Sequence, residues 1–128
     1  MDVEGRMLEK LAGQLYEEHS RKGIGDFPLT ARIEGYWDRG DTEIDLVAIN
    51  SMDRRIRFGS CKRSLENLMG DVSVLDSHIQ RFLKQFPASK DWRIERVSLA
   101  PEIPDFIRER LTAQGHIAQD LHDLTQGR

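Results

Sequence analysis

The sequence predicts an α/β domain in which helices flank a mixed β-sheet. Two observations lead to this fold class. Apolar residues recur every three or four positions in three segments, which is typical of helices that pack through one face. Between these segments lie short stretches rich in β-branched residues, which are typical of strands. The resulting order, α-β-β-β-α-β-α-β, predicts a sheet that is covered by helices.

The first half of the chain is expected to hold one helix and three strands. Apolar residues at helical spacing place the helix from Asp2 to about Ser20, and a Gly- and Pro-containing loop follows it. The three strands are predicted over residues 32–37, 43–49 and 55–61. The last two strands form a hairpin, because a turn-like segment joins them.

The second half is expected to alternate helices and strands. A long amphipathic helix is predicted over residues 64–86, where Pro87 ends it. A strand over 93–99, a helix over 104–114 and a last strand over 115–121 follow, and then a polar tail.

Length and composition exclude several classes of protein. Residues 1–128 are expected to form a single domain, since domains most often contain about 100–150 residues. No apolar run is long enough to span a membrane, and the charged N-terminus is unlike a signal peptide. Cys61 is the only cysteine, which excludes a disulfide framework and favours the reducing cytoplasm. With a formal net charge of -3, binding to DNA would require a local basic patch.

The hairpin carries the most informative polar residues. Asp45 lies in a strand, EIDLVAI, where an aspartate is unusual and costly to bury without a partner. Strict alternation places Glu43, Asp45 and Val47 on one face of this strand. Lys62 ends the neighbouring strand, so an acid and a lysine meet at the rim of the sheet. The pair either holds a divalent cation against a phosphate or is an ion pair without chemistry.

Several segments resemble a known family when they are taken together. They are Tyr36-Trp37-Asp38-Arg39, Glu43-Ile44-Asp45-Leu46-Val47-Ala48, Phe58-Gly59-Ser60-Cys61-Lys62 and, near the N-terminus, Gly5-Arg6-Met7-Leu8-Glu9. The sequence resembles the PD-(D/E)XK nuclease-like domain found at the C-terminus of prokaryotic, mostly archaeal, ATPases, which is a domain of unknown function. The family patterns are G-x-W-W, E-I-D-hydrophobic-V-A, F-G-E-C-K and, in the first helix, G-x-x-F-E. The resemblance covers nearly the whole chain.

The resemblance implies a restriction-endonuclease-like fold and a nuclease that acts on DNA with Mg²⁺ or Mn²⁺. Asp45 would be the main metal ligand and Lys62 the catalytic lysine. Glu9 would be the acid that the first helix supplies, and the backbone carbonyl of Cys61 would help to hold the metal. An ATPase, in the same chain or in another, is the implied partner. In the first case the chain would be a fragment of a longer protein, and in the second it would not.

Ser60 departs from the family pattern, which has a glutamate two residues before the lysine. A serine hydroxyl is a poor ligand for a hard dication, so the domain is either a degenerate nuclease or one whose acid has moved to the next helix. Asp76 is the candidate for a moved acid and metal ligand, because it falls within the apolar arc of the helix over 64–86. Pairing of Asp76 with an arginine at the seam between helix and sheet is the alternative. We favour loss of the acid, because aspartate is shorter than the glutamate that usually makes this reach.

A basic run on the hairpin is the candidate surface for DNA. Its members are Arg54, Arg55, Arg57, Lys62 and Arg63, and the aromatic residues Tyr36 and Trp37 nearby are candidates for stacking on bases. A solvated edge strand is the alternative interpretation of these charges.

The sequence thus predicts a metal-dependent DNA endonuclease domain. The alternative is a non-catalytic module of the same fold that binds nucleic acid or regulates an ATPase, and Ser60 is the residue that separates the two hypotheses.

Overall fold

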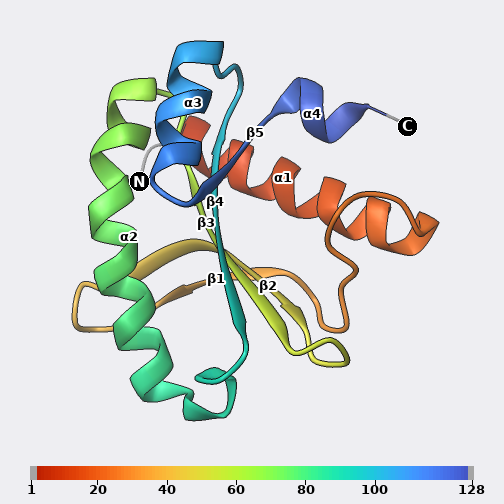
Figure 1. Cartoon of the computed structure of the whole chain (residues 1–128), viewed down its shortest axis with the longest axis vertical. Coiled ribbons are helices and arrows are strands. Elements are labelled where there is room, and N and C mark those ends of the chain that lie inside the picture. Colours follow the sequence, from red (N-terminus) through yellow and green to blue (C-terminus); the bar gives the residue numbers. More distant parts are fainter. Residues whose placement is uncertain (1–2, 127–128) are drawn as a thin grey trace.

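A mixed five-stranded sheet forms the centre of the molecule (Figure 1). The computed structural model describes residues 3–126, with side chains described from residue 6 onwards. The helices are α1 (Val3–Lys22), α2 (Leu65–Gln85), α3 (Asp105–Ala113) and α4 (Leu121–Thr125), with a short 3-10 helix, η1, at Pro87–Ser89. The strands are β1 (Glu34–Trp37), β2 (Glu43–Asn50), β3 (Arg55–Cys61), β4 (Arg93–Ala100) and β5 (His116–Asp120). These elements confirm the predicted α/β class.

The strands lie in the order in which they occur in the chain, β1-β2-β3-β4-β5. The first three strands pair antiparallel, through the predicted hairpin of β2 and β3. Strands β3, β4 and β5 pair parallel, because α2 and α3 carry the chain back across the sheet between them. The sheet therefore has β1 at one edge and β5 at the other.

Helices cover both faces of the sheet and bury an apolar core on each side (Figure 1). On one face, α1 and α4 pack on alternate residues of the central strands, among them Leu46, Cys61 and Leu99. On the other face, α2 packs on Ile56 and Phe58, and its N-terminal half joins α3 in a further cluster. Side chains of β3 therefore alternate between the two cores, which decides where each polar residue near its end points.

The predicted boundaries agree with the structure to within two residues for most elements. Helix α2 begins where Ser64 accepts a hydrogen bond from the backbone N–H of Asn67, and it ends just before Pro87. The predicted start of the first helix at Asp2 lies outside the described residues. The predicted polar tail is wrong over α4, because Asp120 and Asp123 form a reciprocal capping box that starts a short helix. None of the described helices has the length and apolarity that crossing a membrane requires.

The pairing of β1 with β2 contains a bulge. Glu34 pairs with Val47, whereas Tyr36 pairs with Ile44. One residue of β1 therefore lies opposite two residues of β2, and the extra residue changes the side-chain alternation of β2 at that point.

The bulge turns Asp45 toward α1. Asp45 and Leu46 both line the cleft on the α1 side, while Ile44 and Val47 pack in the core beneath α2. The strict alternation predicted from the sequence, with Asp45 and Val47 on one face, is therefore wrong. Gly35 lies opposite the bulge, where a Cβ atom would be only 2.9 Å from the backbone oxygen of Asp45.

Candidate functional site

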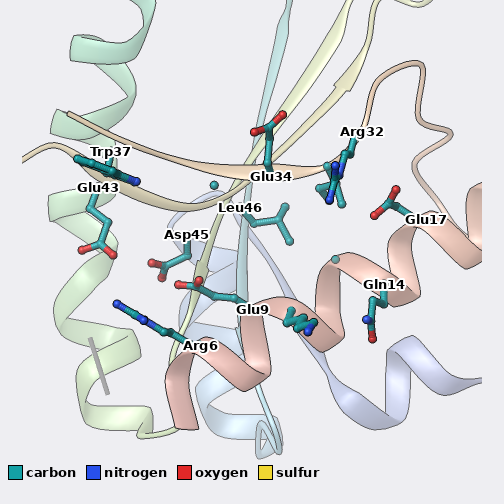
Figure 2. Close-up of a pocket in the computed structure, with 14 residues that line it drawn as sticks. Arg6, Glu9, Gln14, Glu17, Arg32, Glu34, Trp37, Glu43, Asp45 and Leu46 are labelled. Carbon is teal, nitrogen blue, oxygen red and sulfur yellow. The ribbon is translucent and has the colours of Figure 1, made fainter. Parts of the chain in front are cut away.

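Three carboxylates meet in a cleft of about 830 Å³ between α1 and strands β1 and β2 (Figure 2). Glu9 comes from α1, and Glu43 and Asp45 come from β2. One oxygen of each lies within 4.8 Å of the others. We call these three residues the acidic cluster. Figure 2 shows the carboxyl groups of Glu9 and Asp45 directed toward each other from the two walls of the cleft.

Asp45 is the central member of the acidic cluster and is only 8% exposed. Its Oδ2 accepts two hydrogen bonds, from the backbone N–H of Cys61 at 2.8 Å and from Nζ of Lys62 at 2.9 Å. The chain positions these donors at the end of β3, where the N–H of Lys62 in turn donates to the carbonyl of Leu99. The structure thus brings together the acid and the lysine that the hairpin motif singles out.

The pKa of Glu9 is raised in this arrangement. Burial, a hydrogen bond with Asp45 and the negative charges of Asp45 and Glu43 raise the pKa of Glu9 to about 8. Its Oε1 is buried and has no hydrogen-bond partner among the described residues. A buried carboxyl oxygen without a partner is uncommon, because the loss of hydration is not compensated.

Lys62 remains charged despite its partial burial. Burial alone would lower its pKa, but the charges of Asp45, Asp71 and Glu43 and the hydrogen bond to Asp45 raise the pKa above its usual value. Lys62 therefore acts as a cation bound to Asp45 and not as a base at neutral pH.

Ser60 points away from the acidic cluster, toward α2. Its side chain is buried, and its hydroxyl donates a hydrogen bond to Oδ2 of Asp71 at 2.5 Å. The negative charge of Asp71 also raises the pKa of Lys62. Helix α2 therefore places the carboxylate of Asp71 against the side chain of Ser60, the residue that departs from the pattern of the resembled family.

Asp76, the predicted acid of α2, does not face the sheet core. Its side chain is 55% exposed and pairs with Nε of Arg96 on β4 at 2.5 Å. This is the ion pair at the helix–sheet seam that the sequence left as the alternative. The expectation that Asp76 lies on the packed face of α2 is wrong. Its carboxylate lies at the exposed edge of the contact between α2 and the sheet.

The predicted basic run on the hairpin is not a continuous surface. Arg57 is 1% exposed and binds Asp26 and Glu95, so it cannot reach a DNA phosphate. Arg55 is half-buried and pairs with the same Glu95. Arg54 is exposed, but it lies at the turn end of β3, at the opposite end of the strand from Lys62. The prediction of a basic run facing DNA is therefore wrong for Arg57. Arg63, the last member of the run, is exposed and follows Lys62 in the chain.

The cleft contains other basic residues that the sequence did not single out. Arg6 and Lys10 reach it from α1, and Arg32 reaches it from the segment before β1. Trp37, a predicted contact to DNA, also lines the cleft and is 77% exposed. Only the spacing of Arg6 and Lys10 on the face of Glu9, one turn apart on a helix, could have indicated this group.

Cys61 is fully buried beneath α1, as expected for a core residue. Burial and the charges of Asp45 and Glu9 raise the pKa of its thiol well above the usual value. The thiol is therefore inert, and the part of Cys61 that meets the site is its backbone, through the N–H bound to Asp45.

The mixed sheet, the acidic cluster and the paired lysine define an α/β domain with a candidate cation site in a cleft. The family model DUF234, described as archaea bacterial proteins of unknown function, matches residues 3–70 of the 128. The chain belongs to this family. No curated protein and no solved structure gives a significant match. The matched segment contains Glu9, Glu43, Asp45 and Lys62.

Proposed function

We propose that this chain is a divalent-cation-dependent phosphodiesterase domain of the PD-(D/E)XK type, which acts on DNA in the cytoplasm. The observation that carries the proposal is the convergence of Glu9, Glu43 and Asp45 in a surface cleft, with Lys62 bound to Asp45. The resemblance of the hairpin motif to nuclease-like domains supports it independently of the geometry.

The donor set suits a hard dication. Mg²⁺ and Mn²⁺ bind carboxylate oxygens, and three carboxylates offer enough negative charge to hold one. The buried Oε1 of Glu9 has no other partner among the described residues, and a cation would supply one as the proton of Glu9 leaves. Asp45 offers Oδ1, since its Oδ2 already accepts from Cys61 and Lys62.

The residues of the cleft then have separate tasks. A bound cation would polarise a phosphoryl oxygen and lower the pKa of a bound water. Lys62, which keeps its charge, would stabilise the negative charge that develops on the phosphate in the transition state. The N–H of Cys61 fixes the orientation of Asp45 and thereby the position of the ligand oxygen.

Calorimetric titration with Mn²⁺ and cleavage of supercoiled plasmid test the proposal. Asp45→Asn should weaken Mn²⁺ binding by more than tenfold, since losing even a group that only orients a metal ligand typically costs about 10–100-fold in affinity. Lys62→Ala should abolish cleavage while Mn²⁺ still binds. Lys62→Arg should also cleave poorly, because a planar guanidinium does not replace a compact ammonium.

Glu109→Gln is the matched control, since it removes an exposed carboxylate on α3 outside the cleft. It should leave both measurements unchanged. Cleavage that persists in EDTA, or Mn²⁺ binding that Asp45→Asn does not alter, would contradict the proposal.

A non-catalytic module of the same fold, associated with an ATPase, is the second candidate. Ser60 favours it, because the hydroxyl removes one charge from the pattern of the resembled family. The ion pair of Asp45 with Lys62 also favours it, since the two charges already neutralise each other. This candidate predicts DNA or ATPase binding without cleavage in any divalent cation.

A further inference from the structure

Trp37 occupies the end of the cleft that is nearest to the acidic cluster (Figure 2). It is the last residue of β1 and pairs with Glu43, a member of the cluster. Trp37 is 77% exposed, although large aromatic residues usually bury most of their surface. An exposed indole on the residue that pairs with a member of the acidic cluster is a platform on which a ring can stack.

The structure holds this platform in place. The turn after β1 is fixed by Asp38, whose N–H donates to the carbonyl of Thr42 and whose carboxylate accepts from the N–H groups of Gly40 and Thr42. Tyr36 points the other way and packs on Phe82 of α2. Of the two adjacent aromatic residues, Trp37 is therefore the one presented to the cleft.

The charges of the cleft suit one strand and not two. Arg6, Lys10 and Arg32 line it, and none of them forms an ion pair within the described part of the chain. Glu17 and Glu34 line it as well, in addition to the acidic cluster. A duplex needs a broad basic surface for the phosphates of both strands, whereas stacking on an aromatic ring supplies affinity for a single strand with few cations.

We infer that the cleft takes an unpaired DNA strand, with one base stacked on Trp37 and the adjacent phosphate at the acidic cluster. The inference rests on the proposed function and adds the substrate class. Base stacking selects unpaired DNA because a paired base presents only its edges, and its faces are covered by its neighbours in the duplex.

Fluorescence anisotropy with a labelled oligothymidylate in Ca²⁺ tests the inference, against a blunt duplex of two complementary strands with the same number of phosphates and no unpaired loop. The oligothymidylate should bind at least tenfold more tightly than the duplex. Trp37→Ala should weaken binding roughly tenfold or more, the range typical of one lost base–aromatic stack. With up to three cations on a single strand, the slope of log K against log salt should be roughly -2.

Two matched proteins isolate the indole. Phe106→Ala removes a 60% exposed aromatic side chain outside the cleft and should leave binding unchanged. Trp92→Phe leaves Trp37 as the only tryptophan of the chain, and its fluorescence should be quenched on titration with the oligothymidylate. Unfolding midpoints within error of wild type should confirm that Trp37→Ala is folded.

Equal or tighter binding of the duplex, or equal affinities of Trp37→Ala and Phe106→Ala, would overturn the inference. If Mn²⁺ binding still depends on Asp45 in that case, the proposed function stands and only the substrate class fails. If the oligothymidylate binds through Trp37 but Asp45→Asn alters neither Mn²⁺ binding nor cleavage, the proposed function fails and the strand-binding inference stands.

Discussion

A partly buried hydrogen bond joins Ser60 at the end of β3 to Asp71 of α2. Ser60 is 2% exposed, and its hydroxyl donates to the carboxylate of Asp71. The resembled family has a glutamate at position 60, so its carboxylate is carried by that residue itself. In this chain, the carboxylate at Ser60 is supplied by Asp71. Substitutions at positions 60 and 71 can therefore test what the departure from the family pattern does to the stability of the fold.

We expect a strong coupling between these two positions. Ser60→Glu should destabilise the fold, because it places a second carboxylate against Asp71, and Asp71→Ala should cost about 1–3 kcal/mol by leaving a buried hydroxyl without its acceptor. The double variant Ser60→Glu/Asp71→Ala removes the repulsion. Urea unfolding should show it to be more stable than the sum of the single changes predicts, by about 0.5–3 kcal/mol. Additive effects would show that the two side chains do not interact.

Arg57 shows why a basic residue in a strand cannot be assigned to a surface from its charge. It alternates with apolar neighbours as an exposed residue would, but it points toward α1 and lies against the rings of Tyr16 and Phe27. Asp26 and Glu95, which come from distant parts of the sequence, neutralise it. Only the packing of the loop after α1 on the sheet makes this burial possible, and no local pattern reports that packing.

At the scale of the elements, the bulge in β2 decides where the site forms. If the alternation of β2 continued unbroken from Val47 back toward Glu43, Asp45 would point into the apolar core beneath α2, where an unpaired carboxylate is not tolerated. The backbone of β2 approaches Gly35 so closely at the bulge that a side chain has no room. Gly35 therefore couples an edge strand to the position of the candidate metal ligand.

Gly35→Ala should lower both stability and Mn²⁺ affinity. A Cβ atom there would lie 2.9 Å and 3.0 Å from the backbone oxygens of Asp45 and Ile44, and the backbone must move to accept it. We expect a loss of about 1–3 kcal/mol in the free energy of unfolding. Gly70→Ala is the control, because no described atom beyond its chain neighbours and the nearby backbone of its own helix lies within 4 Å of its Cβ position, and alanine favours a helix. If Gly35→Ala leaves Mn²⁺ affinity unchanged, the bulge does not position Asp45.

The elements themselves could be predicted because their signals are local. Periodicity located the hairpin and the long helix, and the hairpin motif brought Asp45 to Lys62. Three features could not be predicted. They are the bulge, the contact of Ser60 with Asp71 and not with Asp76, and the burial of Arg57. Each depends on how one element rotates or slides against another, which alternation and helical arcs describe only to within a residue.

At the scale of the whole molecule, the two faces of the sheet differ in their polar contents. The α1 face carries the acidic cluster, whereas the α2 face buries His116 at the start of β5, with 3% of its surface exposed. Its Nδ1 lies 3.0 Å from the hydroxyl of Ser98, and its Nε2 has no partner among the described residues. Burial lowers the pKa of His116 below its usual value of 6.5.

This burial should make the fold sensitive to mild acid. The unfolded chain binds a proton at His116 at a higher pH than the folded chain, so the contribution of His116 to stability is present above pH 6.5 and is lost as pH falls through the folded pKa. Glu9 acts in the opposite sense, since its pKa of about 8 favours the folded state at low pH. His116→Gln keeps Glu9 and removes only the first effect.

Urea unfolding at pH 5.5 and 7.5 should therefore separate the two proteins. The stability of wild type relative to His116→Gln should increase with pH, by no more than about 1.4 kcal/mol per pH unit. A difference that is constant over this range would contradict the assignment to His116.

The buried thiol of Cys61 also provides a chemical probe for the movement of α1 away from the sheet. A thiol reagent reacts with the thiolate, and both the burial and the raised pKa of Cys61 suppress that form while α1 covers the sheet. The peptide of Cys61 binds Asp45, and Glu9 lies on the helix that must move away before the reagent can enter. The rate of alkylation at this one cysteine thus measures how often α1 leaves the sheet, and with it how often the acidic cluster comes apart.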